Sequence, residues 1–149
     1  MKKYVLLSLC LVLLLALGSC GSSGSEDNGN EADMQEFPSF TGLDLDGNSV
    51  NSDIFSENSV TVVNFWFSSC SPCIGELSEL DSLNQELKEK GGAVIGINTD
   101  TLNGDNSMIE EAKKILMQQK ASYRNLYFDS NSGDAMDFAN SITSFPTTY

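Results

Sequence analysis

The sequence predicts an α/β fold in which a parallel sheet is built from βαβ units. Runs of β-branched and aromatic residues at 60–67, 93–99 and 126–128 alternate with segments whose apolar residues recur at helical spacing. Strands that alternate with helices in this way pair in parallel through right-handed crossovers. Cys70 and Cys73 lie between the first strand and the helix after it. Open α/β sheets carry their sites at the carboxyl ends of such strands, so these cysteines mark the candidate site.

The N-terminal part of the fold is predicted to be a β-hairpin. Residues 40–45 and 49–51 are strand-like and flank the tripeptide Asp-Gly-Asn at 46–48. Asp-Gly between two such segments is a strong hairpin signal. The next run, 60–67 (VTVVNFWF), shows little alternation of apolar and polar residues, which is typical of a central strand buried on both faces.

A helix is predicted to begin near Cys73 and to end at Gly91-Gly92, with Lys88 and Lys90 in its last turn. Its inward-facing residues recur at helical spacing. They are Ile74, Leu77, Leu80, Leu83 or Asn84, and Leu87. The spacing leaves open whether Leu83 or Asn84 faces the sheet.

The second half of the chain continues the alternation. Residues 93–99 (AVIGINT) form a second buried strand, and the capping-box pattern at 107–110 (SMIE) opens a helix that runs to about Gln119. The apolar side of this helix carries Ile109, Ala112, Ile115 and Leu116. Residues 126–128 form the third strand, followed by a turn at 129–133 and a short helix at 134–140.

The first 19 residues have the features of a signal peptide. Lys2 and Lys3 precede an apolar run at 4–17 that is shorter than the ~20 residues needed to span a bilayer. The sequence Leu-Gly-Ser-Cys that ends at Cys20 resembles a bacterial lipobox, which implies cleavage before Cys20 and attachment of lipid to its thiol. An ordinary secretory signal with a chance cysteine is the alternative.

The segment after Cys20 is predicted to be a flexible tether. Residues 21–33 (GSSGSEDNGNEAD) are rich in Gly, Ser and acidic residues and lack apolar periodicity. The predicted organisation is therefore a signal peptide at 1–19, a lipidated tether at 20–36 and one folded domain at 37–149.

Composition excludes several classes of function. The formal charge of −13 disfavours nucleic acid and anionic membrane surfaces as partners, and solubility is its simplest explanation. The chain has no histidine, which excludes Ser-His-Asp and Cys-His catalysis and histidine-based metal sites. One isolated Cys-x-x-Cys pair makes a poor metal site, so neither a metal nor a cofactor is expected.

The place of the Cys-x-x-Cys pair at the start of a predicted helix indicates redox chemistry. Of the four cysteines, Cys10 lies in the signal segment and Cys20 is the lipidation candidate, which leaves Cys70 and Cys73 as free thiols. The N-terminus of a helix favours an anion through its unpaired N–H groups and its dipole. A thiolate is such an anion and is the nucleophile of disulfide exchange. The pair is therefore a candidate redox couple.

The region after the tether resembles the TlpA/ResA-like branch of the thioredoxin superfamily, which comprises membrane-anchored extracytoplasmic thiol–disulfide oxidoreductases. The matching segments are Phe37-Pro38-Ser39-Phe40, Leu43-Asp44-Leu45-Asp46-Gly47, Val63-Asn64-Phe65-Trp66, Cys70-Ser71-Pro72-Cys73, Glu76 and Ser144-Phe145-Pro146-Thr147-Thr148. The resemblance implies a thioredoxin-like fold and a Cys-x-x-Cys couple that acts on protein disulfides.

The resemblance also assigns roles to single residues. Cys70 is expected to be the exposed attacking thiol and Cys73 the buried resolving thiol. Pro72 restricts the active-site turn without losing a needed hydrogen bond. Pro146 matches a cis-proline that helps to shape the substrate groove, with a trans loop proline as the alternative. Trp66 is expected to pack near the active-site turn, although it is equally consistent with a plain core aromatic.

Two acidic residues have competing interpretations. Glu76 matches a glutamate one turn after the second cysteine in the family, but it also suits a helix N-terminus. Asp100 lies near the place where related proteins carry a buried carboxylate thought to accept the proton of the resolving thiol, and a loop aspartate is the alternative we favour. Asn64 replaces an aspartate found in cytosolic-type thioredoxins, which removes one candidate base.

The chain also departs from the family pattern. Ser78 replaces a proline, and Phe145 before Pro146 is bulkier than the residue common there. The chain ends three residues after Pro146, whereas the family continues with two antiparallel strands and a terminal helix. The expected fold therefore lacks those strands and that helix.

Two classes of function follow. The first, which the resemblance implies, is a lipid-tethered monomeric enzyme on the extracytoplasmic side of the cell membrane. It is expected to reduce disulfides of exported proteins, as in cytochrome c maturation, with electrons from a membrane thiol donor. The second is a non-catalytic thioredoxin-like lipoprotein that binds a partner or fails to fold. A peroxiredoxin is disfavoured because residues 64–70 lack the Pro-x-x-x-Thr-x-x-Cys pattern.

Overall fold

The computed structural model describes residues 36–149. The predicted signal segment, Cys20 and the tether up to residue 35 lie outside the described residues. Within residues 36–149, no helix is both long enough and apolar enough to cross a membrane.

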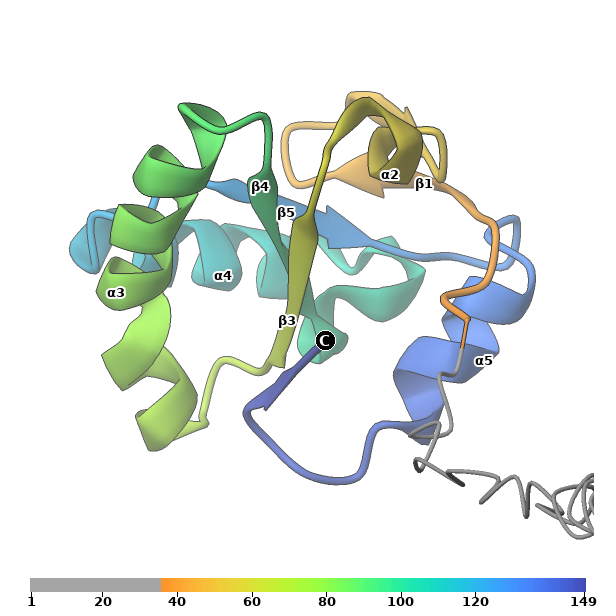
Figure 1. Cartoon of the computed structure of the whole chain (residues 1–149). Coiled ribbons are helices and arrows are strands. Elements are labelled where there is room, and N and C mark those ends of the chain that lie inside the picture. Colours follow the sequence, from red (N-terminus) through yellow and green to blue (C-terminus); the bar gives the residue numbers. More distant parts are fainter. Residues whose placement is uncertain (1–35) are drawn as a thin grey trace, which may run out of the picture. The chain divides into compact units, whose positions relative to one another are not determined.

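The domain is built on a six-stranded sheet with the order β2-β1-β5-β4-β3-β6 (Figure 1). The strands are β1 Thr41–Asp44, β2 Ser49–Asn51, β3 Thr61–Trp66, β4 Ala93–Asn98, β5 Arg124–Tyr127 and β6 Thr147–Thr148. The central strands β3, β4 and β5 are parallel, while β1 is antiparallel to both β2 and β5. The predicted hairpin and parallel core are confirmed.

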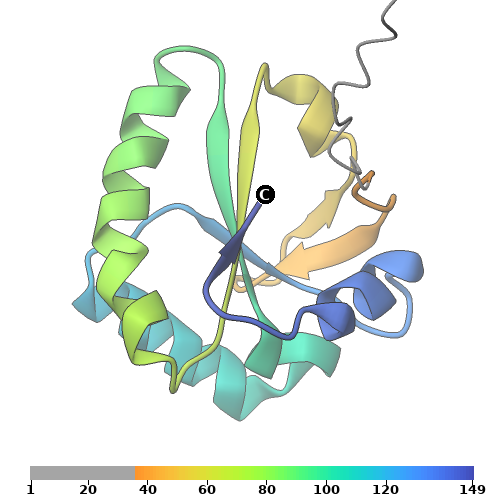
Figure 2. The ribbon, with the colours of Figure 1, turned by 60° about the horizontal axis from the view of Figure 1, so that its bottom comes forward.

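Helices cover both faces of the sheet. They are α2 Ile54–Glu57, α3 Ser71–Lys88, the 3₁₀ segment η1 Thr99–Gly104, α4 Asn106–Gln118 and α5 Asp134–Ser141. Helices α3 and α4 lie on one face and α5 on the other (Figures 1 and 2). The short elements α2 and η1 were not predicted.

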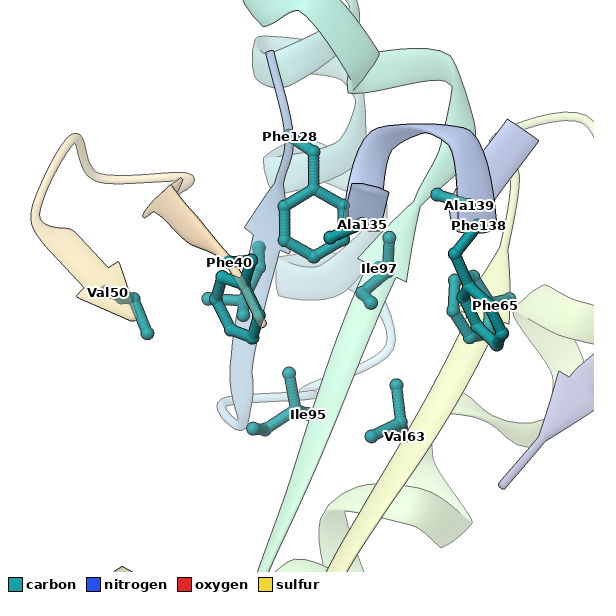
Figure 3. Close-up of a cluster of buried hydrophobic side chains, with 11 residues drawn as sticks. Phe40, Val50, Val63, Phe65, Ile95, Ile97, Phe128, Ala135, Phe138 and Ala139 are labelled. Atoms are coloured by element: carbon teal, nitrogen blue, oxygen red, sulfur yellow. The ribbon is translucent and has the colours of Figure 1, made fainter. Parts of the chain in front are cut away.

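The central strands bury side chains on both faces, as their continuous apolar character predicted. Val63 and Phe65 of β3 and Ile95 of β4 point to the α5 side, where they join a cluster rich in phenylalanine (Figure 3). Trp66 and Val94 point to the side of α3 and α4. Successive strand residues point to opposite faces of a sheet, so each strand contributes to two cores.

Helix α3 resolves the choice between Leu83 and Asn84. Asn84 is 1% exposed, whereas Leu83 is 37% exposed. The Asn84 Oδ1 atom accepts a hydrogen bond from the Val94 backbone N–H over 3.0 Å. Pairing between β4 and β5 begins only at Ile95, so β5 provides no acceptor for the Val94 N–H. The side-chain amide of Asn84 provides that acceptor instead. The polar Asn84, and not the apolar Leu83, thus faces the sheet.

The start of α4 differs from the predicted capping box. Asp105, not Ser107, is the N-cap, and its Oδ1 accepts hydrogen bonds from the backbone N–H groups of Ser107 and Met108 at 2.8 and 3.1 Å. An aspartate is as good an N-cap as a serine. The helix therefore begins two residues earlier, at Asn106, and buries the predicted Ile109, Ala112 and Leu116.

Near the end of the chain, β6 pairs antiparallel with β3 through Asn64–Thr148 and Phe65–Thr147. This two-residue strand was not predicted within the chain. It brings the segment that contains Pro146 alongside the strand that leads to Cys70 (Figure 2).

Candidate active site

The two cysteines lie where β3 ends and α3 begins. Cys70 is the N-cap of α3, and Cys73 is in its first turn. They form a disulfide whose Cα atoms are 5.2 Å apart. The Cys73 backbone N–H donates to the Cys70 Sγ over 3.2 Å. The sulfur of Cys70 is thus placed among the unpaired N–H groups of a helix start, as the sequence predicted.

Burial distinguishes the two sulfurs less sharply than expected. Cys73 is fully buried, and Cys70 is only 5% exposed. The prediction of an exposed Cys70 is therefore wrong for this disulfide-bonded form. Both cysteines belong to the apolar cluster under α3 and α4, which covers them. Cys70 is nevertheless the outer of the two.

Trp66 is both a core residue and a neighbour of the site. It is fully buried in the cluster that contains both cysteines, and its Nε1–H donates to Asn125 Oδ1 over 2.8 Å. A Cβ atom at Gly96 would collide with the Asn125 side chain. Sequence reasoning missed Asn125 and Gly96, although an isolated glycine in a buried strand signals a close approach.

Three consecutive residues at the end of β4 hold the loop before Cys70. Asp100 Oδ2 accepts from the Ser68 backbone N–H over 2.7 Å, and Asn98 Nδ2 donates to Ser68 Oγ over 3.3 Å. The Thr99 hydroxyl donates to the Trp66 carbonyl over 3.4 Å, and Asn98 Oδ1 accepts from the Asp100 N–H over 2.9 Å. Asn98, Thr99 and Ser68 were not singled out from the sequence.

The position of Asp100 agrees in part with each of its two predicted interpretations. It is partly buried in η1, and its carboxylate hydrogen-bonds the loop before the cysteines rather than Cys73. The favoured loop interpretation is right about its location. The structure adds that this loop residue contacts the active-site turn directly.

Glu76 is partly buried, and its carboxylate faces the sheet. Its Oε1 accepts from Asn64 Nδ2 over 2.8 Å, and the same amide donates to Thr148 Oγ1 over 3.2 Å. Asn64 is fully buried, and its Oδ1 has no hydrogen-bond partner among the described residues. The glutamate thus links α3 to β3 and, through Asn64, to β6.

The Phe145–Pro146 peptide bond is cis, as the resemblance implied for Pro146. Phe145 packs against both core clusters, and its ring meets that of Phe67 edge-on with centroids 5.0 Å apart. Pro72 lies in the first turn of α3 and is exposed. The structure thus brings the segment before Pro146 against the segment before Cys70.

The active-site cluster also contains a buried tyrosine. Tyr123 is 3% exposed, and its hydroxyl has no partner among the described residues. Burial raises its pKa well above the usual value, and the negative charges of Glu76 and Asp81 raise it further. The phenol therefore stays neutral over the whole physiological range.

A hollow of about 750 Å³ lies at the opposite end of the sheet from the cysteines, lined by residues such as Lys88, Ala93 and Arg124, and neither cysteine lines it. No cluster of three or more His, Cys, Asp or Glu residues among 36–149 could hold a metal ion.

A central strand, the helix that follows it and a disulfide at the start of that helix define thioredoxin-like redox proteins, and this domain has all three. The chain belongs to the AhpC/TSA family, whose model matches residues 34–139. Its similarity to a ResA protein and to solved thiol-disulfide oxidoreductases confirms the resemblance to TlpA/ResA-like proteins.

Among curated proteins, the thiol-disulfide oxidoreductase ResA of Bacillus thuringiensis subsp. konkukian is 30% identical over 104 residues. The match covers 67% of this chain and 60% of that relative, so the chain spans about 60% of the length of the curated relatives it matches.

Two solved structures are similar at the same level. The thioredoxin domain of a thiol-disulfide oxidoreductase from Bacteroides vulgatus is 30% identical with a TM-score of 0.60, and the match covers 76% of each chain. A thiol:disulfide interchange protein from Bacteroides sp. is 30% identical with a TM-score of 0.59, over 74% of this chain and 68% of that one.

Proposed function

We propose that this protein is a thiol–disulfide oxidoreductase that uses Cys70 and Cys73 to reduce disulfides of other proteins. One observation carries the proposal: Cys70 Sγ caps a helix N-terminus and is bonded to the sulfur of Cys73. A sulfur in this position is stabilised as a thiolate and can both attack and leave. The names of the similar proteins support the same activity.

The reaction has two exchange steps. In the reduced protein, the Cys70 thiolate attacks one sulfur of a substrate disulfide, so that a mixed disulfide forms and the second substrate sulfur leaves as a thiolate and takes a proton. Cys73 then loses its proton and attacks Cys70 Sγ, which releases the first substrate sulfur. Two electrons have passed to the substrate, and the protein holds the Cys70–Cys73 disulfide.

The surrounding residues have supporting roles in this proposal. Trp66 belongs to the buried cluster that contains the disulfide, and Asp100 holds the loop that precedes Cys70. Glu76 ties the first turns of α3 to β3 through Asn64. Pro146 places the segment that precedes β6 beside the site.

The location of the activity is also proposed. The lipobox-like sequence supports a lipid anchor at Cys20, which would hold a monomeric domain on the extracytoplasmic side of the cell membrane. There it would receive electrons from a membrane thiol donor and reduce exported proteins, including those that need free cysteines for cytochrome c maturation. Fractionation of cells that express the chain and its Cys20→Ser variant tests the anchor. Release of the variant alone is expected, and soluble wild-type protein would refute lipidation.

Insulin reduction with dithiothreitol tests the activity. We expect the full chain to accelerate precipitation of the insulin B chain and Cys70→Ser to abolish that acceleration. Cys73→Ser should instead accumulate a mixed disulfide through Cys70, because the resolving thiol is absent. A wild-type rate equal to that of Cys70→Ser would refute the proposal.

A further inference from the structure

The hollow at the end of the sheet opposite the cysteines has the size of a ligand site. Its volume of about 750 Å³ is within the range of about 300–1,000 Å³ that is usual for small-molecule sites. The end of α3, the end of α4, the start of β5 and the turn between β1 and β2 all contribute to its wall. No step of the proposed disulfide exchange uses this hollow, so its polar residues need a separate explanation.

Asn84 contributes a buried, unpaired donor to the wall of this hollow. The residue is 1% exposed, and its Oδ1 accepts from the Val94 N–H at the part of β4 with which β5 does not pair. Val94 lines the same hollow. The Asn84 Nδ2 has no hydrogen-bond partner among the described residues. A buried donor without an acceptor is unfavourable, which indicates that the hollow receives an acceptor oxygen.

The hollow also gathers positive charge in a strongly acidic chain. The described domain has six basic residues, and three of them, Lys88, Lys113 and Arg124, line this hollow. Lys113 is paired with Asp46 at 3.1 Å. Lys88 has no carboxylate within ion-pair distance in the described domain, and Arg124 reaches Asp44 only through its Nε at 4.0 Å. The Lys88 ammonium and the outer nitrogens of Arg124 are therefore available to a ligand.

Three carboxylates line the hollow as well, but two of them are already engaged. Asp44 accepts hydrogen bonds from the backbone and side chain of Asn48, and Asp46 holds the paired lysine. Glu57 is then left against two available cations, which favours an anionic ligand. The carbonyl end of α3 is a sufficient reason for a lysine in its last turn, but not for Arg124 at the start of β5.

Apolar side chains complete the wall. Ile54, Leu116 and Met117 line the hollow, and Met117 is 73% exposed. A bare inorganic anion would leave this apolar surface in water, whereas an organic anion would cover it. We propose that the hollow binds a small organic anion whose acidic head group contacts Lys88 and Arg124 and whose apolar body lies on Met117. The proposal does not depend on the oxidoreductase function.

The test uses two fluorescent probes that share an apolar body. They are 8-anilinonaphthalene-1-sulfonate, which is an anion, and N-phenyl-1-naphthylamine, which lacks the sulfonate. Fluorescence titration of the full-length protein should show saturable binding of the anionic probe. The double variant Lys88→Gln/Arg124→Gln should raise the Kd of the anionic probe about fivefold, the scale of a partly exposed charge contact. It should change the Kd of the neutral probe less than about twofold, because the apolar wall remains.

Lys90→Gln/Lys114→Gln is the matched control. Both lysines are exposed and neither lines the hollow, so this variant removes the same charge from the same end of the domain. Its affinity for the anionic probe should stay within about twofold of the wild type. Met117→Ser tests the apolar half of the site and should weaken binding of both probes. If the double variant does not fold, as judged by circular dichroism, Met117→Ser and the competition below decide.

Competition against the bound anionic probe identifies the class of ligand. Decanoate, which joins a carboxylate to an apolar chain, should displace the probe, whereas the same concentration of inorganic phosphate should not. Three results would overturn the proposal. They are no saturable binding to the wild type, equal weakening in the double variant and its lysine control, and displacement by phosphate as effective as that by decanoate.

Discussion

The backbone N–H of Ser68 donates to the Asp100 carboxylate over 2.7 Å, which joins the loop before Cys70 to the end of the neighbouring strand. Asn98, which is fully buried, adds a second contact to Ser68 and also holds the Asp100 backbone. The position of the reactive sulfur at the start of α3 therefore depends on β4 and η1 as well as on β3.

Removing this carboxylate should loosen the loop. Asp100→Ala leaves the Ser68 N–H without its acceptor, which we expect to reduce the free energy of unfolding by about 1–2 kcal/mol. Urea denaturation of the disulfide form measures this. Asp46→Ala is the control, since Asp46 makes an exposed ion pair with Lys113 and should cost under about 1 kcal/mol. Equal losses in the two variants would contradict the role given to Asp100.

The buried hydrogen bond between Trp66 and Asn125 should contribute strongly to the stability of the domain. Asn125→Ala removes the acceptor of the buried Trp66 Nε1–H, and we expect a loss of about 2–3 kcal/mol in the free energy of unfolding. Trp66 is the only tryptophan of the chain, so its fluorescence reports this environment directly. Asn125→Asp keeps an acceptor oxygen and should restore part of the hydrogen bond. A loss below about 0.5 kcal/mol in Asn125→Ala would contradict this account.

The inner face of α3 gives a matched pair of substitutions. Asn84→Ala leaves the Val94 N–H unpaired in a buried position and should destabilise the domain by about 1–3 kcal/mol. Leu83→Ala alters an exposed neighbour and should change stability by no more than about 0.5 kcal/mol. Thermal unfolding of both variants checks the order. The reverse order would mean that Leu83 and not Asn84 faces the sheet.

Low pH should weaken the hydrogen bonds that join Asp81 of α3 to Ser122 and Tyr123, directly before β5. Burial alone raises the pKa of Asp81, but hydrogen bonds from Ser122, Gln85 and Tyr123 together outweigh it and hold the pKa below its usual value. A folded-state pKa below the unfolded one gives stability that is present above about pH 4 and lost as the pH falls through the folded value. The stability gap between wild type and Asp81→Asn should therefore shrink on acidification. A gap that is constant or grows toward low pH would contradict this assignment.

Sequence patterns revealed the fold and the redox pair because both depend on local features. The apolar runs of β3 and β4 and the Cys-x-x-Cys pair at a helix start are visible within short windows. The contacts of Ser68 with Asn98 and Asp100 join residues about 30 positions apart, and nothing local marks them. Such contacts depend on how the ends of two strands meet.

The wrong expectations have specific physical causes. The capping box at Ser107 was displaced because Asp105 offers an equally good cap two residues earlier. Cys70 was expected to be exposed because it begins a helix, but the surrounding apolar cluster covers the disulfide. The Trp66–Asn125 hydrogen bond is made possible by Gly96, whose missing side chain leaves room for Asn125.

The central claim is that the start of α3 stabilises the Cys70 thiolate. The pH dependence of Cys70 alkylation in reduced Cys73→Ser measures it most directly, because this variant isolates one thiol and keeps the backbone N–H at position 73. The account predicts a pKa well below the ~8.5 of a free cysteine. An ordinary or raised pKa would contradict it.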